Sequence, residues 1–271
     1  MKISCLIDNC ALEGFESEHG LSFYIEACGK RVLFDMGASG AFIQNARALG
    51  IDLAGVDFAV LSHGHYDHGG GLAAFLELNP SAKVYIRRGA FEKHYSHKPG
   101  MPLEYIGLDP ALEGGGRIVE TGESASPCEG FTLVSAADGN ELRSSANDVL
   151  LGPDARTPDS FAHEQNLLIN EGGRRVLIAG CAHRGIVNII NRVFNMDPVP
   201  PRAVFGGFHL AIPGTQYVNE PLVDATAEFL LSLPGTEYFT GHCTGLPSYE
   251  RLRSAMGSRL RYIHAGESVE I

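Results

Sequence analysis

The segment that decides how this chain folds is Leu61-Ser62-His63-Gly64-His65-Tyr66-Asp67-His68-Gly69-Gly70-Gly71. It places three histidines and one aspartate within six residues, directly after the apolar run 58–61. Imidazole nitrogen and carboxylate oxygen are the ligands that zinc and similar metals take from proteins. Crowding such groups together is costly unless a cation gathers them. The segment therefore predicts a metal site at the end of a strand.

The composition of the 271-residue chain is that of a globular protein, since 44% hydrophobic and 20% charged residues allow a substantial core. The net charge of −11 argues against sequence-independent nucleic-acid binding, which needs a cationic face. The first residues lack the apolar core of a signal peptide, and no apolar run is as long as a membrane span. The six cysteines lack paired spacing, which indicates reduced thiols. We therefore expect a cytoplasmic protein that binds neither membrane nor nucleic acid.

Short apolar strands alternate with helical patterns along the chain, which favours a layered α/β fold. Residues 31–35 are predicted to form a strand, followed by a helix over 39–49 that ends before Gly50. A second strand over 56–62 leads into the histidine segment. The three glycines 69–71 then allow a sharp turn into a short helix over 72–78, which Pro80 stops.

A weak internal repeat supports this architecture. The stretch 29–34, Gly-Lys-Arg-Val-Leu-Phe, is echoed by 173–178, Gly-Arg-Arg-Val-Leu-Ile. Each copy completes a hairpin-like pair of strands, with 21–25 before the first and 166–170 before the second, and each precedes a helix. Two such units suggest two packed sheets with helices outside.

Residues 87–130 differ from the rest, because they are rich in glycine, proline and charge. We interpret them as an insertion on the substrate side, over one end of the sheets. No long polar linker divides the chain, so we predict a single domain over 1–271. Four basic residues of the insertion would suit a phosphate group on a substrate or would simply be solvated: Arg87, Arg88, Lys93 and Lys98.

Further metal ligands are expected where other strands end, because catalytic metal sites draw ligands from several strand ends. Three histidines follow an apolar run and a glycine in this way: His183, His209 and His242. His163 precedes a strand and is a weaker candidate. Asp35 ends the first strand and would either orient a ligand imidazole or close a turn. Three other histidines are expected on the surface: His94, His97 and His264.

These motifs together resemble the metallo-β-lactamase superfamily. The resemblance rests on His-x-His-x-Asp-His at 63–68, on Leu-Phe-Asp-x-Gly at 33–37, on the Gly-x-x-His segment at 180–183 and on Gly241-His242. It implies an αβ/βα sandwich of two mixed sheets flanked by helices, with metal at one edge. It also implies two ligand sets: His63, His65 and His183 for one ion, and Asp67, His68 and His242 for the second.

The segments 180–188, 206–210 and 240–245 resemble a narrower group, that of dihydropterin–ribofuranosylaminobenzene 5′-phosphate synthase. One position departs from the superfamily pattern. Many of its hydrolases place a metal-bridging aspartate after the strand at 176–179, where this chain has Cys181. A thiolate there would suit zinc. We expect instead a small buried thiol behind the site, with ligation as the alternative.

The expected function is a metal-dependent hydrolase that uses a metal-bound hydroxide on a small, anionic phosphorylated or ester substrate. We expect one or two divalent ions, zinc first and iron or manganese as alternatives. Asp67 and His209 are predicted to be catalytic, Asp67 by holding metal and orienting the nucleophile. Three alternatives are a transferase that joins a dihydropterin diphosphate to a ribofuranosylaminobenzene phosphate, an iron-dependent thiol oxygenase and, least favoured by charge, a nuclease.

Overall fold

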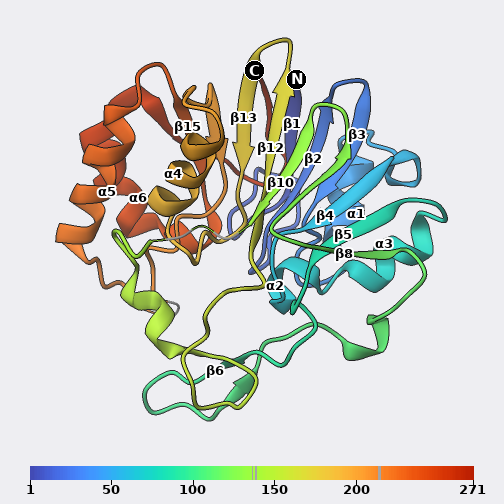
Figure 1. The fold of residues 1–271 in the computed structure, drawn as a ribbon, viewed down its shortest axis with the longest axis horizontal. Helices are drawn as coiled ribbons and strands as arrows, with labels where there is room; N and C mark the ends of the chain where they lie inside the picture. Colours follow the sequence, from blue (N-terminus) through green and yellow to red (C-terminus); the bar gives the residue numbers. More distant parts are fainter. Residues whose placement is uncertain (136, 138, 213–214) are drawn as a thin grey trace.

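The computed structural model describes residues 1–135, 137, 139–212 and 215–271 and consists of two large β-sheets packed face to face (Figure 1). The first sheet has seven strands, in the order β17 (Ser268–Glu270), β1 (Lys2–Ile7), β2 (Ser22–Ala27), β3 (Lys30–Phe34), β4 (Phe58–Leu61), β5 (Lys83–Arg87) and β8 (Ile118–Thr121). The second also has seven, in the order β16 (Leu260–Tyr262), β15 (Glu237–Thr240), β14 (Ala203–Phe205), β13 (Arg174–Ile178), β12 (Gln165–Glu171), β10 (Phe131–Ser135) and β9 (Ser124–Cys128).

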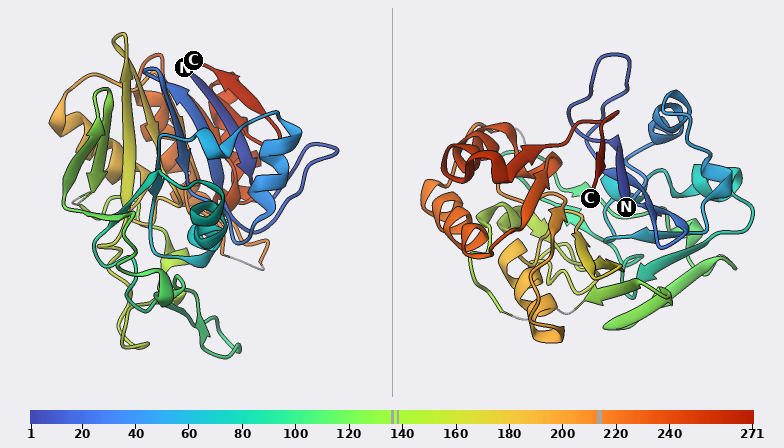
Figure 2. Two further views of the ribbon diagram at one scale, coloured as in Figure 1. Left: turned by 90° about the vertical axis from the view of Figure 1, so that its right-hand side faces the viewer. Right: turned by 90° about the horizontal axis from the view of Figure 1, so that it is seen from above.

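Helices cover the outer face of each sheet, as the view from above shows (Figure 2). Three lie with the first half of the chain: α1 (Ala41–Ala48), α2 (Tyr66–Gly69) and α3 (Leu72–Leu78). Three lie with the second: α4 (Ile186–Met196), α5 (Glu220–Ser232) and α6 (Leu246–Met256). Short 3₁₀ turns complete the chain: η1 (Leu53–Gly55), η2 (Pro110–Leu112), η3 (Ser145–Val149), η4 (His242–Thr244) and η5 (Gly257–Arg259). The predicted αβ/βα sandwich is confirmed.

The core has three layers that follow from this arrangement. Between the sheets, aromatic side chains of both interlock, with Phe23 edge-on to Phe205, which stacks on Phe239. The inner faces are mostly apolar because both sides of each central strand are covered. Outside the first sheet, Phe42 and Phe75 of α1 and α3 pack on it. Outside the second, α4 packs its Ile and Val side chains on the strands. This burial provides the main driving force for folding.

Both predicted β-β-α units are present, one per sheet. The hairpin β2–β3 precedes α1, and the hairpin β12–β13 precedes α4. In each sheet the second hairpin strand pairs in parallel with its next neighbour, β3 with β4 and β13 with β14. The parallel run continues through β14, β15 and β16. Since parallel strands end at the same sheet edge, the loops after β13, β14 and β15 lie together there.

The segment 87–130, predicted as an insertion, supplies strands to three sheets. Its strands β8 and β9 lie at the outer edges of the two large sheets. Its strands β6 (Tyr95–Ser96) and β7 (Glu104–Tyr105) join β11 (Leu150–Leu151) in a small third sheet, which extends below the sandwich in Figure 1. The single domain with a substrate-side insertion stays a prediction. Among the described residues, none of the helices has the length and apolar character to cross a bilayer.

Candidate metal centre

The predicted histidine segment forms the tight link between β4 and α2, and its four polar side chains are buried. Gly64 is required inside it, because a Cβ at that position would collide with the carbonyl oxygen of Ala90. His65 is extended and begins α2, so Asp67 and His68 fall on its single turn. The segment therefore directs its four polar side chains inward.

The first ligand group consists of His63, His65 and His183. The Nε2 atom of His63 lies 3.1 Å from Nδ1 of His65 and 3.3 Å from Nε2 of His183. Burial lowers the pKa of all three rings well below the usual histidine value, so they are neutral donors of lone pairs. Tetrahedral zinc with bonds of ~2.0–2.1 Å would separate such nitrogens by roughly 3.3 Å. The two spacings at His63 match those around one divalent ion, with His65 and His183 each facing the same nitrogen of His63.

The second ligand group consists of Asp67, His68 and His242. The Oδ2 atom of Asp67 lies 3.3 Å from Nε2 of His242 and 3.8 Å from Nε2 of His68, and the two histidine nitrogens are 3.2 Å apart. Burial alone would raise the pKa of the Asp67 carboxyl, but His68 and the hydrogen bond with His242 outweigh it and hold the pKa well below its usual range. Burial opposes the charge on His242, yet the Asp67 bond and Cys243 raise its pKa to about 9. The group fits a second ion.

Cys181 lies between the two groups. Its buried sulfur is 3.1 Å from Nε2 of His68. It forms one potential ligand group with Asp67, His68 and His242 and another with His63 and His183, and within each group the ligand atoms lie within 4.8 Å of one another. Burial and the neighbouring Cys243 raise the pKa of its thiol. A bound cation would offset the free-energy cost of forming the thiolate there. Cys181 is buried, as expected. Its position between the two groups favours a role as a metal ligand over that of a thiol packed behind the site.

Hydrogen bonds from behind fix most of the ligand rings. Asp35, which follows β3, accepts a bond from Nδ1 of His68 at 2.6 Å and from the amide and hydroxyl of Ser62, both at 2.7 Å. A carboxylate only accepts, so Nδ1 of His68 carries the hydrogen and Nε2 is left for metal. The same pattern holds for His183, whose Nδ1 lies 3.0 Å from Oδ1 of Asn147, and for His242, whose Nδ1 lies 2.9 Å from Oδ1 of Asn9. The orienting role predicted for Asp35 matches this geometry.

Several of these supporting residues do not emerge from sequence reasoning. Asn9 and Asn147 are single polar residues in loops, which carry no periodic signal. Glu164 is buried and accepts bonds from the amides of His183 at 2.6 Å and Arg184 at 3.1 Å. Burial raises the pKa of Glu164 to about 7. A glutamate next to the weaker candidate His163 was the one available signal.

His209 lies where the sequence predicts it, after β14 and beside His183, with the two ring centroids 4.2 Å apart. Its backbone has a φ of +48°, an uncommon conformation for a residue with a side chain. Ala182 and His242 share this feature, at +55° and +47°. Neither ring nitrogen of His209 has a hydrogen-bond partner among the described residues, although the side chain is buried. Its ring is available to a substrate.

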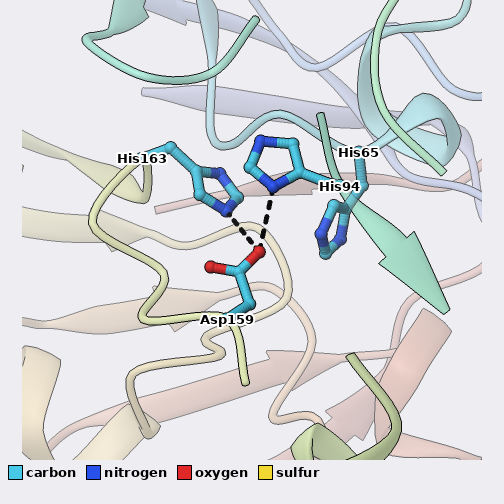
Figure 3. A group of neighbouring side chains, drawn as sticks. All are labelled: His65, His94, Asp159 and His163. Carbon is cyan, nitrogen blue, oxygen red and sulfur yellow. Dashed lines mark hydrogen bonds and ion pairs between the residues drawn. The ribbon is translucent and has the colours of Figure 1, made fainter. Parts of the chain in front are cut away.

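His94 corrects a prediction. It was expected on the surface, but it is 2% exposed and lies with His163 and Asp159 behind His65 (Figure 3). Burial follows because residues 90–94 turn under the histidine segment, where the carbonyl of Ala90 meets Gly64. His97 is exposed as expected, and His264 is partly exposed.

Both ligand groups open into a cavity of about 840 Å³. Its walls include His65, Asp67, Cys181, His183, His209 and His242, together with Tyr66, Lys98 and Ile106 from nearby segments. Of the four basic residues predicted to meet a phosphate, only Lys98 lines this cavity. A pocket of this size suits a small molecule.

The comparisons with known proteins agree with this geometry. The metallo-β-lactamase superfamily model matches residues 18–242, and the chain belongs to that superfamily. It is 28% identical to the 7,8-dihydropterin-6-methyl-4-(β-D-ribofuranosyl)-aminobenzene-5′-phosphate synthase of Methanocaldococcus jannaschii, over 94% of this chain and 91% of that protein. The predicted resemblance to the superfamily and to this narrower group is confirmed.

Two solved structures have folds similar to this one. The crystal structure of Tm1679, described as a metal-dependent hydrolase of the β-lactamase superfamily, matches with a TM-score of 0.79 and 28% identity over 100% of this chain and 99% of that one. Zn²⁺-bound PqqB from Methylobacterium extorquens matches with a TM-score of 0.58 and 12% identity over all of both chains. The second likeness concerns the fold alone.

Proposed function

We propose that this protein is a metal-dependent hydrolase of a small phosphorylated or ester substrate. The observation that carries the proposal is the pair of ligand groups that share Cys181 at the base of a small-molecule cavity. The measured separations, 3.1–3.3 Å in the first group and 3.2–3.8 Å in the second, are close to the ligand spacing around a divalent ion. The similarity to Tm1679, described as a metal-dependent hydrolase, supports the reaction class.

The residues that would hold the first ion are His63, His65 and His183. Those for the second are Asp67, His68 and His242, with Cys181 between them. Imidazoles, a carboxylate and a thiol form a set that suits zinc, with iron and manganese as alternatives. Divalent ions bound there would supply Lewis-acid activation and lower the pKa of coordinated water.

The protein's own groups would orient the substrate and handle protons. Asp67 presents Oδ2 to the second group, which leaves its other oxygen to accept a hydrogen bond from an attacking water. His209 borders the cavity with two unpartnered ring nitrogens among the described residues, so it can donate to or accept from the substrate. His19 lies 3.4 Å from Asp67 at the mouth and is half-exposed.

Metal analysis combined with a substrate screen tests the proposal. Purified protein should contain one to two equivalents of a divalent metal by elemental analysis. It should hydrolyse a member of a panel of phosphomonoesters, phosphodiesters, thioesters and lactams, and dialysis against a chelator should abolish that activity. Loaded protein that is inert on every class would overturn the hydrolase.

A transferase is the second candidate, because the synthase of M. jannaschii aligns over nearly the whole chain. In that case the same cavity would bring a dihydropterin diphosphate to an aromatic ribosyl phosphate, and the ions would hold the leaving pyrophosphate. A condensation assay with both substrates discriminates between the two. Pterin-dependent pyrophosphate release without ester hydrolysis would replace the hydrolase with this function.

A further inference from the structure

Next to His65 of the first ligand group, three buried side chains form a cluster: His94, Asp159 and His163 (Figure 3). His94 precedes β6, and the other two lie in the segment before β12. One oxygen of Asp159, Oδ2, lies 2.9 Å from Nδ1 of His94 and 3.3 Å from Nε2 of His163. Neither the metal groups nor the cavity account for this cluster.

The backbone of Gly64 decides the protonation of His163. Its amide lies 3.0 Å from Nδ1 of His163. A backbone N–H can only donate, so Nδ1 must accept and carries no hydrogen. In the neutral ring the hydrogen is then on Nε2, which donates to Asp159. His163 thus links the loop between His63 and His65 to a buried carboxylate.

Asp159 is an anion within this cluster. Its Oδ2 accepts from His94 and His163, and its Oδ1 accepts from the amide of Phe161 at 2.7 Å. Burial would raise the pKa of this carboxyl, but the bonds from the two histidines hold it well below its usual range. Three donors on one carboxylate compensate for its removal from water.

These side chains and His65 also have the composition of a third cation site, since one ligand atom from each lies within 4.8 Å of the others. The Gly64 amide argues against it. A metal on Nε2 of His163 would force the ring hydrogen onto Nδ1, directly against the Gly64 N–H. His163 is therefore a hydrogen-bond donor to Asp159 and not a ligand.

The remaining member, His65, has one nitrogen committed and one without a partner. Nδ1 faces Nε2 of His63 in the first ligand group, at 3.1 Å. Nε2 is buried and has no hydrogen-bond partner among the described residues. With Nδ1 on a metal, Nε2 must carry the hydrogen. One nitrogen of His65 and one oxygen of Asp159 lie within 4.8 Å of each other, so the buried carboxylate is close enough to attract that N–H.

We propose that Asp159, held by His94 and His163, is a buried anionic anchor that positions His65 to bind metal through Nδ1. The inference rests on the proposed metal site. The anchor acts on the same ligand group at two further points. His163 fixes the loop through Gly64, and Phe161, whose amide Asp159 binds, stacks flat on His183 with ring centroids 4.4 Å apart.

The test uses full-length protein loaded with cobalt(II), whose hyperfine-shifted NMR signals report exchangeable N–H groups on bound histidines. Asp159→Asn should shift or lose one such signal and weaken the binding of one ion by about 10–100-fold in chelator competition. The second ion should keep its affinity. Asp154→Asn, an exposed turn residue of the same segment, is the matched control and should change neither.

Variants of His163 separate the anchor from a packing role. The amide N–H of Gln can replace the Nε2 donor to Asp159, so His163→Gln should retain most of the metal affinity. His163→Phe fills similar space without a donor and should behave like Asp159→Asn. Thermal unfolding of the metal-free proteins shows whether each variant is folded. If Asp159→Asn does not fold, the comparison of His163→Gln with His163→Phe tests the anchor on its own.

Three results overturn the anchor. Unchanged N–H signals and unchanged affinity for both ions in folded Asp159→Asn would do so. Equal loss in His163→Gln and His163→Phe would indicate packing alone. A third equivalent of metal in the native protein that disappears with His94→Phe would show a cation site in place of the anchor. Native protein that binds no metal would overturn the proposed function itself.

Discussion

The two halves of the molecule provide the candidate metal ligands in different ways. The first sheet contributes four of them from one loop after β4, whereas the second contributes Cys181 and His183 after β13, and His242 after β15. A single tight loop fixes its ligands by local backbone geometry. Ligands on separate strand ends depend on the register of the whole sheet. The first half should therefore hold its geometry more autonomously than the second.

The largest expected effect comes from removing one ligand from each half of the same group. His63→Ala and His183→Ala should each weaken the first ion by more than ~100-fold, beyond the loss typical of supporting residues. Elemental analysis after gel filtration measures this. His97→Ala, an exposed histidine, is the control. If His183→Ala retained its metal, the first ion would depend on the first half alone.

The strong signal of the first half explains what the sequence could predict. Strand 58–61 followed by a dense His and Asp motif identifies a site, and the repeated Gly-Arg/Lys-Arg-Val-Leu stretch identifies the hairpin in each sheet. In the second half only the pattern of strand, glycine and histidine is available, and it predicts His183, His209 and His242. The anchor was missed: His94 was assigned to the surface, because nothing local shows that residues 90–94 turn beneath Gly64.

Cys181 is the one residue of the second half that belongs to both candidate ligand groups, and its replacement should have the next largest effect. Cys181→Ser should lower metal content by about one equivalent and remove a sulfur-to-cobalt charge-transfer band from the cobalt(II) protein. Cys181→Asp, which restores the carboxylate found in many superfamily hydrolases, should recover the second equivalent without the band. Cys10→Ser, another thiol at the cavity, is the control. An unchanged band in Cys181→Ser would exclude ligation by this sulfur.

Replacing the residues that hydrogen-bond to the candidate ligand rings should weaken metal binding less than replacing the ligands themselves. Asp35→Asn leaves one acceptor oxygen for the three donors of His68 and Ser62, so the second ion should bind about 10–100-fold more weakly. Asn147→Ala removes one neutral acceptor from His183 and should cost the first ion about tenfold. Chelator competition ranks them. An equal or greater loss in Asn147→Ala would show that the charge of the supporting acceptor does not set the size of the effect.

The smallest expected effect concerns the segment 87–130, which contributes none of the candidate metal ligands. Lys98 lines the cavity, and Lys93 of the same segment is exposed and does not. An exposed pairing of Lys98 with a substrate phosphate would contribute up to ~1 kcal/mol, so Lys98→Ala should raise KM for a phosphorylated substrate by up to about fivefold, with kcat unchanged. Added salt should reduce the difference, since partly exposed charges are screened. Lys93→Ala should leave KM unchanged, and an equal rise in both variants would mean that the segment acts through net charge rather than through a contact in the cavity.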